Sequence, residues 1–195
     1  MRAVFGLGNP GPRYAGTRHN VGFRVLEVLV RRAHAEPGPS AAEYRWWRAT
    51  FGAEAAALVA PQTYMNESGR ALGAWRERMD LEPGELLVVA DDVYLPLGVL
   101  RVRERGSSGG HRGLESIEAV LGTREYARLR VGVGAAESGA ALREHVLEEL
   151  GGEELEVFDA AIQRAAEVVE CWIGEGVKVA MNRYNQKVTK EVSEP

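Results

Sequence analysis

Residues 86–91 read LLVVAD, an almost continuous apolar run that ends in an acidic side chain. A run of this length predicts a β-strand that is buried on both faces, as in sheets with helices on either side. Residues 2–7 predict a second, short buried strand, which ends in the turn-rich segment GNPGPRYAG. Both strands lead into polar loops at their carboxyl ends, which is where α/β folds place their ligands.

The rest of the chain alternates between helical and extended patterns. The sequence predicts a helix that begins near residue 20 and stops before 36, a hairpin over 43–60, a helix over 68–79, an alternating strand over 99–105, a loop over 106–110, a helix over 114–121 and a strand over 127–134. From residue 142 onward the chain is predicted to be helical, with one long segment over 153–172. This alternation predicts an α/β fold, a single domain with a mixed, twisted β-sheet and helices on both faces.

The composition is that of an ordinary globular protein. Hydrophobic residues make up 45% and charged residues 27% of the 195 positions, which excludes a disordered, collagen-like or disulfide-rich chain. The length predicts one domain over residues 1–195. Because the net charge is −4, a nucleic-acid site would have to be local. Arginines do gather in the middle of the chain, at Arg101, Arg103, Arg105, Arg112, Arg128 and Arg130.

The single cysteine and the N-terminus bear on the compartment. Cys171 cannot form an internal disulfide and lies in an apolar helical pattern, which favours a reducing compartment. Residues 1–10 hold too short an apolar run for a secretory signal, and no stretch approaches the roughly 18 apolar residues of a membrane span. We expect a cytoplasmic protein without membrane association.

Gly6, Gly8 and Gly11 satisfy the G-x-G-x-x-G pattern of dinucleotide-binding loops. Such a loop needs a helix that begins at the third glycine, so that its N-terminus meets the pyrophosphate. Pro10, Pro12 and the segment AGTRHN postpone the helix. The pattern therefore indicates a tight loop after a strand.

Residues 106–110, GSSGG, satisfy the G-x-S-x-G pattern, which would make Ser108 the nucleophile of a serine esterase. The histidines that follow are His111, on the same loop, and His145, which has no evident orienting acid. A loop that lets the backbone move or approach a ligand is the more economical interpretation.

No metal-ligand spacing is present in the sequence. The four histidines, at 19, 34, 111 and 145, and the one cysteine form no C-x-x-C or H-E-x-x-H pattern. We expect no metal site.

Polar residues follow the predicted strands. Asn9 and His19 flank the first loop, Asn66 ends the turn PQTYMN, and Asp91 and Asp92 end the strand quoted above. Each has an ordinary structural explanation as a turn, cap or strand-end residue. Together they are also the parts of a water-activating site, in which a carboxylate orients a histidine base and amides hold the carbonyl under attack.

Five segments resemble bacterial peptidyl-tRNA hydrolases: in chain order, GLGNPGPRYAGTRHNVG, PQTYMNESG, VVADDVYLP, GGHRGL and RLRVGVG. These motifs run to about Gly134, and the helical C-terminal part resembles the family in length and character only. The resemblance implies a monomeric α/β enzyme without a cofactor. Its implied reaction is hydrolysis of the ester that joins a peptide to the 3′ end of tRNA.

The resemblance also implies roles for individual residues. His19 matches the catalytic histidine and Asp91 its orienting aspartate. Asn9 matches the catalytic-site amide that distinguishes blocked from free amino groups, and Asn66 a substrate-binding amide. The positions matching the rest of the substrate and tRNA site are the aromatic Tyr14 and Tyr64, the pair Arg103 and Arg130 for the tRNA 5′ phosphate, and His111 and Arg112.

The chain departs from the family pattern at three places. Arg112 stands where the family usually has asparagine, and a guanidinium donates hydrogen bonds but cannot accept them. Tyr94 replaces a usual aspartate, and Ala135-Ala136 replaces a proline-containing turn.

Elementary chemistry leads to the same mechanism. A neutral imidazole at His19, with an ordinary pKa of about 6.5, can take a proton from water, and a carboxylate at Asp91 would stabilise the resulting imidazolium. Asn9 and Asn66 can donate hydrogen bonds to the peptide or the oxyanion. No covalent nucleophile is needed, because an aminoacyl ester is already an activated acyl group.

The predicted strand over 99–105 would place Arg101, Arg103 and Arg105 on one face at intervals of about 7 Å, near the phosphate spacing of RNA. The same charges also suit an exposed edge strand.

The leading prediction is an esterase specific for peptidyl-tRNA. Two alternatives stay open: a non-catalytic RNA-binding module of the same fold, and a serine esterase built on Ser108. Intact His19 and Asp91 count against the first alternative, and the missing triad partners count against the second.

Overall fold

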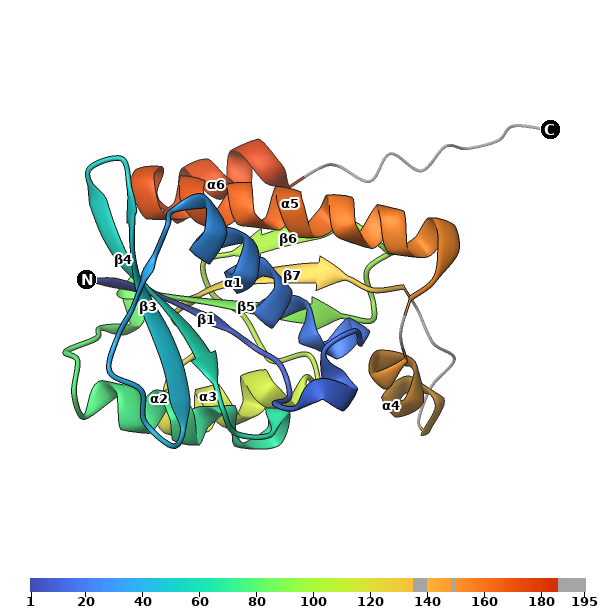
Figure 1. The fold of residues 1–195 in the computed structure, drawn as a ribbon, viewed down its shortest axis with the longest axis horizontal. Coiled ribbons are helices and arrows are strands. Elements are labelled where there is room, and N and C mark those ends of the chain that lie inside the picture. Colours follow the sequence, from blue (N-terminus) through green and yellow to red (C-terminus); the bar gives the residue numbers. More distant parts are fainter. Residues whose placement is uncertain (135–139, 149, 186–195) are drawn as a thin grey trace.

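Seven strands form one mixed sheet in the computed structural model, which describes residues 1–134, 140–148 and 150–185 (Figure 1). The strand order is β2-β3-β4-β1-β5-β7-β6. β4, β1, β5 and β7 run parallel to one another, whereas β2, β3 and β6 pair antiparallel at the two sides. The bounds are β1 Arg2–Gly6, β2 Glu36–Pro37, β3 Tyr44–Phe51, β4 Glu54–Pro61, β5 Leu86–Asp92, β6 Leu100–Arg103 and β7 Ala127–Gly132.

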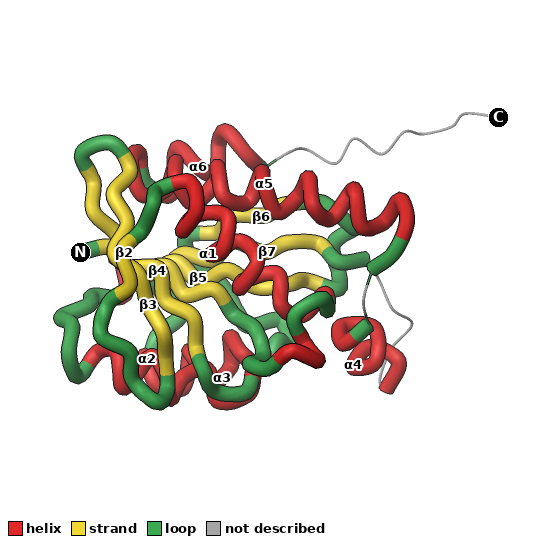
Figure 2. Tube along the Cα trace, viewed as in Figure 1, coloured by secondary structure: helices red, strands yellow, loops and turns green. Residues whose placement is uncertain are grey.

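Helices cover both faces of this sheet (Figure 2). α1 (Val21–Arg32), α5 (Gly152–Glu175) and α6 (Val177–Tyr184) pack on one face, and α2 (Ser68–Arg76) and α3 (Arg112–Leu121) pack on the other. α4 (Ala140–Leu147) lies beyond the carboxyl ends of β5 and β7. The predicted fold class is thereby confirmed.

The core explains why β5 reads as a continuous apolar run. All seven of its residues are buried, because helices lie on both sides of it. Leu87 and Val89 face α1 and α5, whereas Val88 faces α2. Each such side chain stabilises the fold by about 1.5–3 kcal/mol relative to an exposed position.

Gly6 and Gly22 let α1 pack directly on the backbone that follows β1. A Cβ at Gly6 would lie 2.4 Å from the carbonyl oxygen of Gly22, and a Cβ at Gly22 would lie 2.3 Å from the amide nitrogen of Leu7. No side chain fits at either position. The first glycine of the G-x-G-x-x-G pattern is therefore required by helix packing, and α1 begins only at Val21, well after Gly11.

Gly22→Ala is expected to lower the free energy of unfolding by about 3 kcal/mol, because the added methyl group meets rigid backbone. The measurement is urea-induced unfolding followed by circular dichroism. Gly174→Ala is the matched control, since Gly174 is also helical and a Cβ there would meet nothing within 4 Å. Equal stability of the two variants would contradict this account of α1 packing.

Some predicted boundaries were wrong. The strand predicted over 99–105 ends at Arg103, so Arg105 does not share a strand face with Arg101 and Arg103. Arg105 instead lies 3.5 Å from Glu125 in an ion pair. The helix predicted over 68–79 ends at Arg76, and the strand predicted over 127–134 ends at Gly132. The hairpin is present as β3 and β4, with Gly52 at a φ of 61° in its turn.

Candidate active site

The carboxyl ends of the parallel strands meet at one edge of the sheet and surround a cavity of about 510 Å³. β1 leads to Asn9, β4 leads to Tyr64 and Asn66, and β5 ends with Asp91 and Asp92. The structure brings nine of the ten predicted site residues to this cavity: Asn9, Tyr14, His19, Tyr64, Asn66, Asp91, His111, Arg112 and Arg130. Arg103, on β6, is the one that does not line it.

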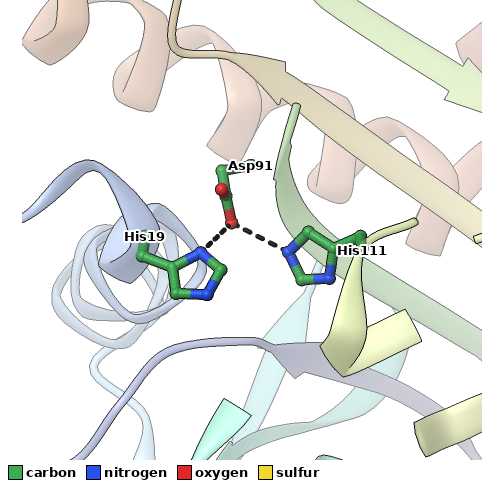
Figure 3. Close-up of side chains that lie close together, drawn as sticks. All are labelled: His19, Asp91 and His111. Carbon is green, nitrogen blue, oxygen red and sulfur yellow. Dashed lines mark hydrogen bonds and ion pairs between the residues drawn. The ribbon is translucent and has the colours of Figure 1, made fainter. Parts of the chain in front are cut away.

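Asp91 is shared between two histidines (Figure 3). Its Oδ1 atom lies 2.8 Å from Nδ1 of His19 and 2.9 Å from Nε2 of His111. His19 comes from the short helical turn before α1, and His111 from the loop before α3. Helices on opposite faces of the sheet therefore deliver the two imidazoles to one buried carboxylate.

The hydrogen bonds fix which nitrogen of each ring carries the proton. Nδ1 of His111 caps α3, because it accepts from the backbone N–H groups of Gly113 (3.1 Å) and Leu114 (3.3 Å). Its proton therefore lies on Nε2 and is donated to Asp91. His19 donates from Nδ1 to Asp91, which leaves its Nε2 with a free lone pair.

Electrostatics prepare His19 to accept a proton. Burial disfavours the imidazolium, but the charge of Asp91 and its hydrogen bond outweigh this effect and raise the pKa of His19 above its ordinary value. Burial also opposes ionisation of Asp91, yet electrostatic attraction and hydrogen bonds from His19 and His111 hold the pKa of Asp91 far below the usual range. Asp91 is therefore ionised throughout the pH range in which His19 titrates.

The donor atoms of His19, Asp91 and His111 all lie within 4.8 Å of one another, which is close enough to consider a metal ion. The hydrogen bonds do not suit one. A metal would need the lone pair of Nε2 in His111, but Nδ1 already accepts from two backbone N–H groups and the proton must sit on Nε2. The geometry fits a hydrogen-bonded cluster of side chains better than a metal centre.

Asn9 is held by an amide partner that the sequence analysis did not identify. Its backbone N–H donates to Oδ1 of Asn20 at 2.8 Å, and its carbonyl accepts from Nδ2 of Asn20 at 3.0 Å. Oδ1 of Asn9 accepts from the backbone N–H of Met65 at 2.8 Å. This leaves the Nδ2 donor of Asn9 for a ligand.

A model of the peptidyl-tRNA hydrolase family matches residues 3–192. The chain belongs to this family. It is 44% identical over 187 residues to the peptidyl-tRNA hydrolase of Desulforamulus reducens, covering 96% of this chain and 90% of that protein. It is 43% identical to a Dehalococcoides mccartyi peptidyl-tRNA hydrolase, covering 95% and 100%. The crystal structure of the Acinetobacter baumannii peptidyl-tRNA hydrolase has a TM-score of 0.89 and 31% identity, covering 95% and 94%.

Within this peptidyl-tRNA hydrolase fold, two further charged residues support the site: Asp92, which the sequence analysis named without its partner, and Arg18, which it did not name. Asp92 accepts from the guanidinium of Arg130 at 3.0 Å. Arg18 is 5% exposed and lies 3.2 Å from Glu154 and 3.5 Å from Glu148. It therefore links the turn of His19 to the first turn of α5 and to the residue that follows α4. Both partnerships are distant in the sequence, and no local pattern indicates them.

The arginines near the site differ in their surroundings. Arg130 also donates to the carbonyl oxygens of Ser107 (2.7 Å) and Ser108 (2.8 Å), so it holds the glycine-rich loop. Arg128 does not contribute to a surface patch, because it is 1% exposed and pairs with Glu118 at 3.2 Å. Arg103 is exposed, and the β6–β7 register places its side chain on the same sheet face as that of Arg130.

The remaining predicted contacts lie at the rim of the cavity. Tyr64 is 56% exposed, and Asn66 and Arg112 are also exposed. Tyr94, which the sequence analysis named only as a departure from the family pattern, also lines the cavity and is 72% exposed. The guanidinium of Arg13 lies 4.4 Å above the ring of Tyr14. The departure at Ala135-Ala136 lies outside the described residues.

Ser108 lacks a base. Its Oγ accepts from the backbone N–H of Gly110, and within the described ranges no histidine forms a hydrogen bond with it. His19 and His111 contact Asp91, and His145 donates to the carbonyl of Val133 at 3.1 Å. The serine-esterase alternative therefore gains no support. In the same ranges, no helix combines the length and the apolar character needed to cross a membrane.

Proposed function

We propose that this chain hydrolyses the ester between a peptide and the 3′ end of tRNA and so returns free tRNA to translation. The observation that carries the proposal is the arrangement of His19 on the wall of the cavity. Its Nδ1 lies 2.8 Å from Oδ1 of Asp91, which leaves the lone pair of Nε2 free to accept a proton. Family membership supplies the substrate class. We also propose that the enzyme acts in the cytoplasm as a monomer.

The chemistry follows from this geometry. Nε2 of His19 takes a proton from water as the water oxygen attacks the ester carbonyl carbon, and Asp91 stabilises the imidazolium. The amide N–H groups of Asn9 and Asn66 donate to the peptide or to the developing oxyanion. The bond to the ribose oxygen then breaks, and the imidazolium returns its proton to that leaving oxygen. Because His19 activates the water, the proposed reaction requires no cofactor or metal.

The test is acyl release from N-acetyl-aminoacyl-tRNA and from free aminoacyl-tRNA under identical conditions. We expect rapid release from the N-blocked substrate and much slower release from the free one, because we infer that the Nδ2 donor of Asn9, which lines the cavity, binds the blocked amino group. Binding of the N-blocked substrate without release would instead favour an RNA-binding module, and equal release from both substrates would refute the proposed specificity.

We also infer that Arg103 and Arg130 hold the 5′ phosphate of the tRNA, while Tyr14 and Tyr64 contact its acceptor end. Arg103→Glu is expected to raise KM for full-length tRNA substrates and to reduce the slope of log Kd against log salt by about one. Arg103 is the cleaner site to test, because Arg130 also holds the loop through Ser107.

Steady-state kinetics at several salt concentrations check this prediction, with a short substrate that lacks the 5′ phosphate for comparison. Arg48→Glu, at an exposed position on β3, controls for net charge. Equal losses on the full-length and short substrates would mean that Arg103 serves the fold or the chemistry.

Arg112 occupies the first turn of α3 at the cavity, where the family pattern has an amide. Since a guanidinium cannot accept a hydrogen bond from water, we infer that Arg112 binds the phosphates or ribose near the tRNA 3′ end. Arg112→Asn is expected to keep kcat within about tenfold and to raise KM, by an amount that shrinks at high salt. A large fall in kcat with KM unchanged would instead place the guanidinium in the transition state.

A further inference from the structure

His111 links the N-terminus of α3 to Asp91 through its two ring nitrogens. One ring nitrogen caps α3, and the other donates to the same carboxylate oxygen of Asp91 that His19 uses. The side chain of His111 is 9% exposed, so most of its surface is occupied by the protein rather than offered to a substrate. The ring centroids of His19 and His111 are 5.3 Å apart.

We propose that His111 is a positioning residue: it holds the carboxylate of Asp91 in place and, by sharing Oδ1 with His19, keeps the His19 imidazole neutral to a lower pH than Asp91 alone would allow. The inference rests on the proposed role of His19 as the base. It assigns His111 a function through Asp91, in place of the substrate contact that the family resemblance implies.

The physical reason is the division of charge on one oxygen. A hydrogen bond from Nε2 of His111 stabilises the Asp91 anion and reduces the pull of Oδ1 on the proton of His19. The α3 cap keeps the proton on Nε2 of His111, because Nδ1 accepts two backbone N–H groups. The ring also cannot rotate away from Asp91 without breaking these two hydrogen bonds. Removal of His111 should therefore make Asp91 more basic and the His19 imidazolium more stable.

The other charged and titratable groups around the cavity stay the same in this comparison. Asp92 and Arg130 neutralise one another as an ion pair at 3.0 Å, and Arg112 lies at the start of α3. The phenols of the cavity belong to Tyr14, Tyr64 and Tyr94. Each of these groups is present in both the wild type and the variants described next.

Two variants separate the cap from the contact with Asp91. His111→Asn keeps an N-cap acceptor, but its side chain ends near the position of Nδ1 and cannot reach Asp91. His111→Ala removes both interactions. We expect both variants to move the acid limb of the pH–kcat profile, where activity falls as His19 is protonated, to higher pH by about half a unit or more. At alkaline pH, kcat should stay within about tenfold of wild type. His111→Ala should lower the Tm because it removes the α3 cap, whereas His111→Asn should keep a Tm close to that of the wild type.

An NMR titration of His19 in His111→Asn gives the readout that does not depend on activity, and it should show a raised pKa. An unmoved His19 pKa would overturn the proposal, as would an acid limb that moves in His111→Ala but not in His111→Asn. A rise in KM with the acid limb unchanged would return His111 to substrate binding. If the His19 pKa rises while the acid limb stays in place, the coupling holds but the proposed role of His19 fails.

Discussion

His19→Ala is expected to lower kcat by a factor of about 10² to 10⁴, while the affinity for tRNA stays close to that of the wild type. A general base acts on the transition state and contributes little to binding of the ground state. The measurement is single-turnover hydrolysis of N-acetyl-aminoacyl-tRNA, together with tRNA binding. The free Nε2 lone pair is lost in this variant, whereas the cavity and the arginines around it remain.

Ser108→Ala is the control for His19→Ala, because Ser108 lies on the loop beside the cavity and, among the described residues, its hydroxyl bonds only to the backbone N–H of Gly110. We expect it to keep wild-type turnover. If it were as inactive as His19→Ala, or if a serine-directed phosphonate inactivated the wild type, attack by water would be the wrong mechanism.

Asp91→Asn is expected to have a comparable effect, with a fall in kcat on the order of 10² to 10⁴. The amide carries no charge to stabilise the imidazolium and no longer enforces the tautomer of His19. The sign of the pH effect also follows: Asp91 raises the pKa of His19, so its removal should move the acid limb of the remaining activity to lower pH. The variants of His111 should move it in the opposite direction.

The pH–rate profile of Asp91→Asn is the measurement, and Asp92→Asn is the matched control from the same strand end. Asp92 pairs with Arg130 and does not contact His19, so the midpoint of the acid limb should not change in the control. An acid limb that moves to higher pH in Asp91→Asn would contradict the assigned electrostatics.

The sequence predicted the elements whose pattern is local. The apolar run of β5 needs no knowledge of its partners to be recognised as buried, and the loops after β1 and β5 identified the edge at which His19 and Asp91 meet. The end of β6 was missed because Arg105 continues the alternation without a ladder partner. Strand alternation shows which face a residue occupies, but not where pairing stops.

The supporting partners could not be predicted, since each depends on a contact between distant segments. Asn20 holds the backbone of Asn9, and Asp92 holds Arg130, across loops that only the folded sheet brings together. His111 could be assigned to the site by its motif, but its link to Asp91 depends on the start of α3 at Arg112.

The central claim is that a neutral His19, with its Nδ1 proton on Asp91 and Nε2 free, is the base. Nitrogen NMR titration of isotope-labelled histidine in the wild-type protein measures this directly. We predict the Nδ1–H tautomer for His19 and a pKa above 6.5 that coincides with the midpoint of the acid limb of kcat. A neutral His19 with its proton on Nε2, or a pKa that does not coincide with that midpoint, would contradict the account.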